Sequence, residues 1–357
     1  MSTQRIAVIG GDGIGPEVVD ATRAVLDALA EVHSLDLAYD EFDWSCRRYA
    51  EHGAMMPDDA LDTLRPYDAI LLGAVGWPGV PDHVSLWGLL IPIRRTFRQY
   101  VNERPMTVFE GVDSPLRRAR PGTEPGGVDL VVVRENVEGE YSEVGGRMNR
   151  GFPDEMAVQE SIFTRVGVSR IAEHAFDLAK RRTGYVTSAT KSNGIVHTMP
   201  FWDEVVADVA AGHPDVRWDA ELIDALAAKV VLEPERFDVI VGSNLFGDIL
   251  SDLTAAVAGS IGIAPSANID PTREFPSMFE PVHGSAPDIA GKGIANPVGT
   301  LWSAVMMLDH LGHPEAASAL MEAIRETLKD PATRTGDLGG SASTAEVTEA
   351  VVQRVRR

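Results

Sequence analysis

Cysteine and long apolar runs are scarce in this sequence. Of its 357 residues only one is a cysteine, Cys46, so no disulfide can form within the chain and a reducing compartment is expected. We interpret Cys46 as a structural or surface residue, because a nucleophilic thiol needs a nearby histidine and an activating environment. The longest uncharged stretch, residues 253–269, is interrupted by Gly259, Gly262 and Pro265, which excludes a membrane-spanning helix there.

Basic side chains are also in the minority. The chain has 32 Lys and Arg against 53 Asp and Glu, a formal net charge of −21. Binding to nucleic acid or to an anionic membrane requires clustered basic residues, so both partners are excluded. The apolar run near the N-terminus, residues 6–9, is too short for the core of a signal peptide. We therefore expect a cytoplasmic protein that gathers its few arginines locally wherever it binds an anion.

Strand patterns alternate with helix patterns along the chain. Short apolar runs predict buried strands at residues 6–9, 68–75, 128–133, 185–190 and 237–242. Apolar residues at helical spacing predict helices at residues 18–29, 166–180, 249–257, 300–311 and 314–328. This alternation indicates an α/β architecture with mostly parallel strands. The Pro- and Gly-rich residues 120–127 predict a loop or the tip of a hairpin.

A glycine-rich turn, GGDGIGPE at residues 10–17, follows the first expected strand. A Rossmann dinucleotide site requires the spacing GxGxxG and an acidic residue about 20 positions later. Asp36 lies near that distance, but the glycines at 11, 13 and 15 give GxGxG. We favour a tight strand-to-helix connection with Pro16 in the first helical turn, and keep a phosphate-binding loop as the weaker alternative.

Three carboxylates stand out from the acidic background. Asp248 and Asp252 lie four residues apart, on one face of the expected helix, where they could hold Mg²⁺ or Mn²⁺ or form a solvated acidic face. Apolar neighbours such as Ile249 and Leu250 suggest a mostly buried helix, which strengthens the metal hypothesis. Asp224 lies in an apolar stretch and needs a lysine or a metal ion as partner.

Basic residues concentrate between residues 94 and 104. Arg94, Arg98 and Arg104 could line one groove and hold carboxylates, or form a solvated helix face. Arg134 and Tyr141 follow a buried strand, where α/β enzymes place ligands. Lys191 ends another strand, where partial desolvation would lower its pKa toward that of a base, although an exposed lysine is the equal alternative. The motifs HExxH, GxSxG and the P-loop are absent, which leaves zinc proteolysis, serine hydrolysis and P-loop NTP hydrolysis unsupported.

Nearly the whole chain resembles the metal-dependent β-decarboxylating dehydrogenases, the family of isocitrate and 3-isopropylmalate dehydrogenases. The most specific segments are SNLFGDILSD at residues 243–252 and EPVHGSAPD at residues 280–288, together with GDGIGP at 11–16 and DLGG at 337–340. The resemblance implies a two-domain α/β fold with a non-Rossmann dinucleotide site. Its larger, cofactor-binding domain would comprise residues 1–101 and 258–357, and its smaller domain, for substrate, metal and dimerisation, residues 102–257.

The resemblance also implies roles for individual residues. Tyr141 would act as general acid and Lys191 as the base that takes the hydroxyl proton. Metal binding falls to three carboxylates, Asp224, Asp248 and Asp252. Substrate binding falls to three carboxylate-clamping arginines and two residues of the specificity wall, Arg94, Arg104, Arg134, Trp87 and Leu90. In the family Lys191 and Asp224 reach the site of the neighbouring subunit, which implies an obligate homodimer.

The cofactor position follows from the same resemblance. The dinucleotide would lie along a later loop rather than on the first glycine turn, so the Rossmann interpretation is rejected. The residues matched to this site are Ile14, Glu280, His283, Gly284, Ser285, Ala286, Asp288 and Asn296. Asp288 would accept hydrogen bonds from ribose hydroxyls and repel a 2′-phosphate, which favours NAD over NADP. Related enzymes suggest activation by K⁺ or ammonium, but no motif decides it.

The segment SLWGLLIPIR at residues 85–94 bears on the substrate. With residues 42–44, 52–57 and 188–194 it looks like the tartrate and D-malate dehydrogenases of this family. Trp87 stands where isopropylmalate enzymes have a glutamate, which would leave no room for a large side group and favours a C4 dicarboxylate. Pro92 is unusual within the expected helix. The expected reaction is oxidative decarboxylation of D-malate to pyruvate and CO₂, with tartrate oxidation as a side or main activity.

Three alternatives have different consequences. A 3-isopropylmalate dehydrogenase would share the family but take a larger substrate. A non-catalytic regulatory relative should have lost part of the catalytic set, yet Tyr141, Lys191 and all three aspartates are present. A metal-independent Rossmann dehydrogenase would remain active in a chelator, and the fingerprint that it requires is missing.

Overall fold

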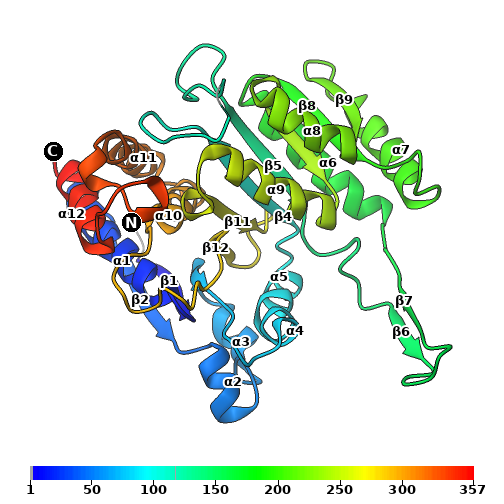
Figure 1. The fold of residues 1–357 in the computed structure, drawn as a ribbon, viewed down its shortest axis with the longest axis horizontal. Helices are drawn as coiled ribbons and strands as arrows, with labels where there is room; N and C mark the ends of the chain where they lie inside the picture. The colour runs from blue at the N-terminus through cyan, green and yellow to red at the C-terminus, as the bar shows by residue number, and fades with distance from the viewer. Residues whose placement is uncertain (1–2, 117) are drawn as a thin grey trace.

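The computed structural model describes residues 3–116 and 118–357, and a ten-stranded mixed sheet runs through its centre (Figure 1). The order is β2-β1-β3-β12-β11-β4-β5-β10-β8-β9. In that order the strands are Leu37–Phe42, Gln4–Gly11, Ala69–Ala74, Ser277–Pro281, Pro265–Ile269, Val101–Thr107, Asp129–Glu135, Val239–Gly242, Tyr185–Thr190 and Arg217–Leu222. The expected α/β class is confirmed.

The sheet has two parallel ends and an antiparallel centre. Strands β2, β1, β3 and β12 are parallel, as are β5, β10, β8 and β9. Strands β11 and β4 pair antiparallel with their neighbours. The β4–β5 hairpin contains the expected loop at residues 120–127 and sets Asn102 opposite Arg134. All five strands expected from apolar runs are present; β2, β4, β9, β11 and β12 were not expected.

Helices cover the sheet in two groups, one for each end (Figure 1). Helices α1 (Gly15–His33), α10 (Val298–His310), α11 (Pro314–Lys329) and α12 (Thr344–Val355) pack on one another at the β1 end. Helices α6 (Arg165–Lys180), α7 (Thr198–Ala210), α8 (Ile223–Leu232) and α9 (Asn244–Ala258) pack around β5, β10 and β8. The two groups follow the expected division of the chain, but the sheet is continuous between them, so the domain boundaries stay a prediction.

Short helices connect β2 to β3 and β3 to β4. They are α2 (Cys46–His52), α3 (Ala60–Leu64), α4 (Asp82–Ser85) and α5 (Ile91–Thr96). Between α4 and α5 the helix widens into a π-helical turn, Leu86–Leu90. This turn explains Pro92, because the first turn of α5 needs no amide hydrogen at that position. Within the described residues no helix is long and apolar enough to cross a membrane.

A two-stranded arm extends from the body of the molecule (Figure 1). It pairs β6 (Gly145–Met148) antiparallel with β7 (Met156–Gln159), and every residue of both strands is exposed. Its apolar side chains include Met148 and Phe152, which are 60% and 68% exposed. An isolated hairpin of this kind is marginally stable in water, so its apolar surface needs a partner.

Candidate active site

A polar cavity of about 240 Å³ lies beside the antiparallel centre of the sheet. Arg94 comes from α5, Arg104 from β4 and Arg134 from β5, while Tyr141 lies on the loop after β5 and Asp248 on α9. The structure thus brings together the three predicted clamp arginines, the predicted acid and one predicted metal ligand. Arg98 does not join them, since its side chain is 63% exposed and pairs with Glu274 at 3.2 Å.

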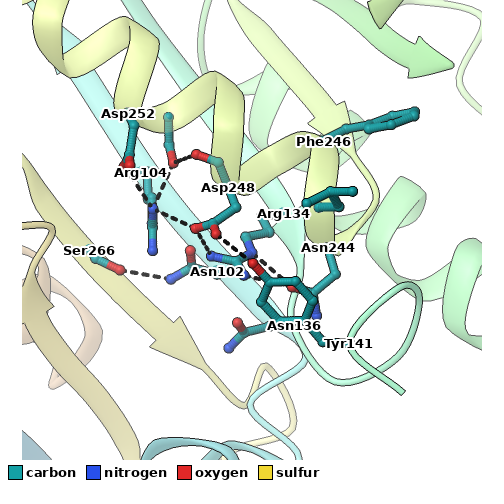
Figure 2. A network of polar contacts seen from close by, with 12 residues as sticks. Asn102, Arg104, Arg134, Asn136, Tyr141, Asn244, Phe246, Asp248, Asp252 and Ser266 are labelled. Carbon is teal, nitrogen blue, oxygen red and sulfur yellow. Dashed lines mark hydrogen bonds and ion pairs between the residues drawn. The ribbon is translucent and has the colours of Figure 1, made fainter. Parts of the chain in front are cut away.

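Two arginines and a tyrosine converge on the carboxylate of Asp248 (Figure 2). Arg134 Nη1 lies 2.5 Å and Arg104 Nη1 3.4 Å from Asp248 Oδ1, and the Tyr141 hydroxyl donates to Oδ2 at 2.9 Å. Burial alone would raise the pKa of Asp248, but the charges of Arg134 and Arg104 lower it overall. Burial, then Asp248, raises the pKa of Tyr141, so the phenol keeps its proton and can donate it.

Arg134 is the most deeply buried of the three arginines. Burial, reinforced by the nearby charge of Arg104, lowers its pKa to about 10, so it remains charged at neutral pH. Its Nε and Nη2 donate to Asn244 Oδ1 at 3.1 and 2.6 Å. Arg94 instead pairs with Glu280 at 2.6 Å. The cavity therefore concentrates positive charge where water is scarce, an arrangement suited to a dicarboxylate.

Only two of the three predicted metal ligands lie together in the structure. Asp248 and Asp252 share one face of α9, and Asp252 Oδ1 lies 3.7 Å from Arg104 Nη1. Burial raises the pKa of Asp252 despite that arginine. Residues 3–116 and 118–357 contain no cluster of three His, Cys, Asp or Glu that could hold a metal ion. The two aspartates provide the hard oxygen atoms that Mg²⁺ and Mn²⁺ prefer, and Asp224, the third predicted ligand, is not beside them.

Asp224 and Lys191 form a separate pair. Lys191 Nζ donates to Asp224 Oδ1 at 2.6 Å, and this bond lowers the pKa of Asp224. The lysine partner expected for Asp224 is thus present, although the carboxylate is 67% exposed rather than buried in an apolar environment. Neither residue lines the cavity. Both are therefore available at the surface of the chain.

The N-terminus of α9 is fixed by residues that sequence reasoning missed. Glu140, next to Tyr141, accepts hydrogen bonds from Ser243 Oγ at 2.7 Å and from the Leu245 amide at 3.0 Å. Its charge lies where the helix dipole favours an anion. Gly247 lets α9 approach β5 closely, since a Cβ there would lie 2.5 Å from the Cβ of Arg134. The SNLFGD motif could have revealed this close contact, but only once its partner strand was known.

A second cavity, of about 460 Å³, adjoins the first. Four of the predicted cofactor residues, Ile14, His283, Ala286 and Asn296, line it, and His283 also lines the polar cavity, where the substrate is predicted to bind. The apolar part of the lining suits an adenine ring, and the buried Nε2 of His283 has no hydrogen-bond partner within the described residues. Burial lowers the pKa of His283, so the imidazole is neutral and can bind a ligand through that atom.

The other predicted cofactor residues have different positions. Gly284 and Glu280 line the substrate cavity, whereas Asp288 is exposed and lines neither cavity. Ser285 lies between the cavities and the first turn, where its carbonyl accepts the Ile14 amide at 2.8 Å. Gly13 has a φ of +61° and leaves no space for a Cβ against that carbonyl. The glycine turn thus packs against the later loop and holds it through this hydrogen bond.

Asp337 is a cavity residue whose side chain sequence reasoning did not assign. It accepts hydrogen bonds from Asn296 Nδ2 at 3.0 Å and Ser260 Oγ at 2.6 Å, and so orients the predicted cofactor ligand Asn296.

The predicted specificity wall, residues 86–90, forms the π-helical turn. Leu86 and Leu90 line the substrate cavity, but Trp87 does not. The turn presents its leucines to the cavity, and the Trp87 ring lies instead 5.0 Å from the guanidinium carbon of Arg95.

Comparison with known proteins accounts for this combination of residues. The profile of the Isocitrate/isopropylmalate dehydrogenase family matches residues 5–351. The chain is 53% identical to D-malate dehydrogenase [decarboxylating] of Escherichia coli (strain K12), with 100% of both chains covered. It is also 53% identical to probable tartrate dehydrogenase/decarboxylase of Bacillus subtilis (strain 168), with 100% of this chain and 99% of the relative covered.

A solved structure shows the same fold. Isocitrate dehydrogenase from Methylococcus capsulatus superposes with a TM-score of 0.89 at 35% identity, covering 99% of this chain and 100% of that one. The chain therefore belongs to the isocitrate/isopropylmalate dehydrogenase family, whose members are β-decarboxylating oxidoreductases of hydroxyacids.

Proposed function

We propose that the protein catalyses the NAD-linked, metal-dependent oxidative decarboxylation of D-malate to pyruvate and CO₂, with tartrate oxidation as a side or main activity. The observation that carries the proposal is the small cavity in which three arginines, Tyr141 and Asp248 face the leucines of the π-helical turn. Three buried guanidinium groups match the two carboxylates of a C4 diacid. The names of the relatives from E. coli and B. subtilis support the same substrates.

Two groups from outside the chain complete the proposed site. Asp248, Asp252 and Asp224 of the partner subunit would hold Mg²⁺ or Mn²⁺, which supplies a Lewis acid for the substrate hydroxyl and carbonyl oxygens. NAD in the adjoining cavity supplies the hydride acceptor, with Ile14, His283, Ala286 and Asn296 around its adenosine. Asp288, which the family resemblance matches to the ribose site, would accept hydrogen bonds from ribose hydroxyls and repel a 2′-phosphate, which favours NAD over NADP.

The protein's own residues perform the proton transfers in this scheme. Lys191 of the partner subunit takes the proton of the C2 hydroxyl, and Arg94, Arg104 and Arg134 hold the carboxylates so that C2 faces the nicotinamide. After CO₂ departs, Tyr141 gives its proton to C3. Its raised pKa supports this role, because the phenol stays protonated until a carbanionic carbon needs it.

A homodimer with shared sites explains the separation of the predicted residues. Lys191 and Asp224 lie outside the cavity of their own chain and would complete the site of the partner. Helices α8 and α9 pack together and expose Leu232 and Ile249, at 72% and 52%. With the apolar arm at residues 145–159, these side chains would form the interface. The exposure of Ile249 also differs from the mostly buried helix expected.

The first test is NAD reduction by the purified protein with Mn²⁺, in the presence and absence of K⁺. The kcat/KM for D-malate, L-tartrate, meso-tartrate, 3-isopropylmalate and isocitrate should be highest for D-malate or a tartrate, and a chelator should abolish activity. A preference for 3-isopropylmalate would refute the small-pocket interpretation but retain the family. Activity that persists in chelator would refute the proposed mechanism.

The role of Tyr141 and the sharing of sites between subunits are tested separately. Tyr141→Phe should impair formation of pyruvate more than hydride transfer, whereas equal loss of both would contradict the role of Tyr141. Lys191→Met and Asp248→Asn homodimers should each be inactive. When the two are unfolded and refolded together, heterodimers contain one site with both native residues, and about a quarter of wild-type activity should return. No recovery despite heterodimer formation would place Lys191 and Asp248 in the same site of one chain.

A further inference from the structure

Arg95 contacts three features of the site without lining the cavity. Its Nη2 donates to the backbone carbonyl of Tyr141 at 2.7 Å, and its Nη1 pairs with Glu143 Oε2 at 2.8 Å. The guanidinium carbon lies 5.0 Å from the centre of the Trp87 ring, within cation–π range. The side chain is 28% exposed, so most of its surface is engaged in these contacts.

These contacts join two segments that are distant in sequence. Arg95 and Trp87 belong to the helical segment that also carries Leu86, Leu90 and Arg94, whereas Tyr141 belongs to the loop after β5. Adjacent arginines thus have different tasks: Arg94 faces the cavity, and Arg95 reaches across to the backbone of the predicted acid. A planar guanidinium can stack on an indole and donate to a carbonyl at the same time, which a lysine cannot do.

The loop that bears Tyr141 has a second attachment on its other side. Glu140 binds Ser243 Oγ and the Leu245 amide at the start of α9, the helix that carries Asp248. The Tyr141 hydroxyl donates to Asp248 itself. Among the hydrogen bonds and ion pairs of residues 140–143 in the described chain, Glu140 and the Tyr141 hydroxyl reach α9, whereas Arg95 alone reaches these residues from the helical segment at residues 82–96.

We propose that Arg95 is a positioning residue that sets the distance between the specificity wall and the phenol of Tyr141. It thereby determines how much of the oxidised substrate is decarboxylated and protonated before release. The inference rests on the proposed function, since the wall meets the substrate beyond C2 and Tyr141 delivers its proton to C3. Loss of Arg95 frees the Tyr141 backbone but leaves Arg94, Arg104, Arg134 and Asp248 in place, so protonation at C3 should suffer more than oxidation at C2.

The test measures the two half-reactions separately in Arg95→Met and Arg95→Lys. With D-malate, NADH and pyruvate are counted in the same sample, and decarboxylation of added oxaloacetate is followed with Mn²⁺ in the absence of D-malate. In wild type, pyruvate should equal NADH. In Arg95→Met, oxaloacetate decarboxylation should fall about tenfold and pyruvate should drop below NADH, while the initial rate of NADH formation changes about threefold or less. Arg95→Lys, which retains a hydrogen-bond donor, should bring the ratio of pyruvate to NADH part of the way back to one.

Arg98→Met is the matched control, because Arg98 forms an exposed ion pair three residues further on and contacts neither Tyr141 nor Trp87. It should leave the ratio at one. An unchanged ratio in Arg95→Met, or the same loss in Arg98→Met, would overturn the proposal. An Arg95 that only stabilises the fold would lower the melting temperature and slow both half-reactions equally. If wild type fails to reduce NAD with D-malate, the proposed function fails, whereas oxaloacetate decarboxylation in the variants still decides the role of Arg95.

Discussion

Substitution of Gly247 by alanine should separate activity from stability. Gly247 lies on α9 where the helix crosses β5, and a Cβ there would lie 2.5 Å from Arg134 Cβ and 2.7 Å from Arg134 Cγ. Carbon atoms pack favourably at about 3.5–4.0 Å, so helix and strand must move apart by about 1 Å. Asp248 is the next residue and binds Arg134 at 2.5 Å, so this movement falls on the substrate site itself.

The substitution should change the free energy of unfolding little and kcat/KM strongly. Overpacking costs about 1–3 kcal/mol, but alanine gains about 1 kcal/mol over glycine in a helix, so the free energy of unfolding should fall by only about 0–2 kcal/mol. A displacement of about 1 Å between catalytic groups can cost about a hundredfold in rate. We therefore expect kcat/KM for D-malate to fall about a hundredfold in a protein that still unfolds cooperatively.

Urea unfolding and steady-state kinetics on the same preparations measure both quantities. Ala256→Gly, at an exposed position of the same helix, calibrates the helix-propensity term and should cost about 1 kcal/mol without changing kcat/KM. A Gly247→Ala protein with kcat/KM within threefold of wild type would show that the close contact between α9 and β5 does not position the site, and would refute the reasoning.

Three further predictions concern single carboxylates. Burial raises the pKa of Glu135 to about 7. The folded state then binds the proton more tightly than the unfolded state, so the free energy of unfolding should fall by up to about 3 kcal/mol as pH rises from about 4.5 to 7. Urea unfolding of Glu135→Gln should lack this dependence on pH. Glu140→Ala should lower the free energy of unfolding by about 2 kcal/mol and kcat about tenfold, because Glu140 holds the start of α9. Glu346→Ala, in the capping box of α12, is the control and should lower stability without changing kcat. If both variants have the same kcat, Glu140 does not position the site. Asp288→Ser should raise the ratio of kcat/KM for NADP to that for NAD about tenfold, and an unchanged ratio would remove Asp288 from cofactor selection.

Local signals in the sequence were sufficient to predict two of the strands that precede predicted site residues, β5 and β8. The apolar run LVVV located β5, and with it Arg134, because buried parallel strands are continuous in hydrophobicity, while the β-branched residues of YVTSAT indicated β8 and with it Lys191. Strands β4, β11 and β12 escaped detection because the antiparallel centre carries buried polar side chains. Asn102, on β4, donates to Ser266 Oγ and Asn268 Oδ1 across the sheet, and such bonds leave no apolar pattern.

The features of the site that depend on contacts between distant segments could not be predicted from the sequence. The clamp arginines were predicted from the family resemblance, whose motifs are local; in the structure Arg104 and Arg134 converge on Asp248, whereas Arg94 pairs with Glu280. The position of Trp87 could not be predicted, because it depends on the π-helical turn and on a guanidinium eight residues later. Asp337 and Glu140 act through partners more than 40 residues away, and no spacing rule connects such positions.

The continuity of the sheet bears on the order in which the chain can fold during synthesis. Strands β4, β5, β8, β9 and β10 all lie between residues 101 and 242, so this end of the sheet can pair as soon as those residues have emerged. At the other end, β1, β2 and β3 can pair with one another within the first 74 residues, but the free edge of β3 must wait for β12, Ser277–Pro281, and α1 must wait for α12, Thr344–Val355. The edge of β3 and the apolar face of α1 therefore stay uncovered, and open to aggregation or chaperone binding, until residues about 200 positions or more further along the chain have been made.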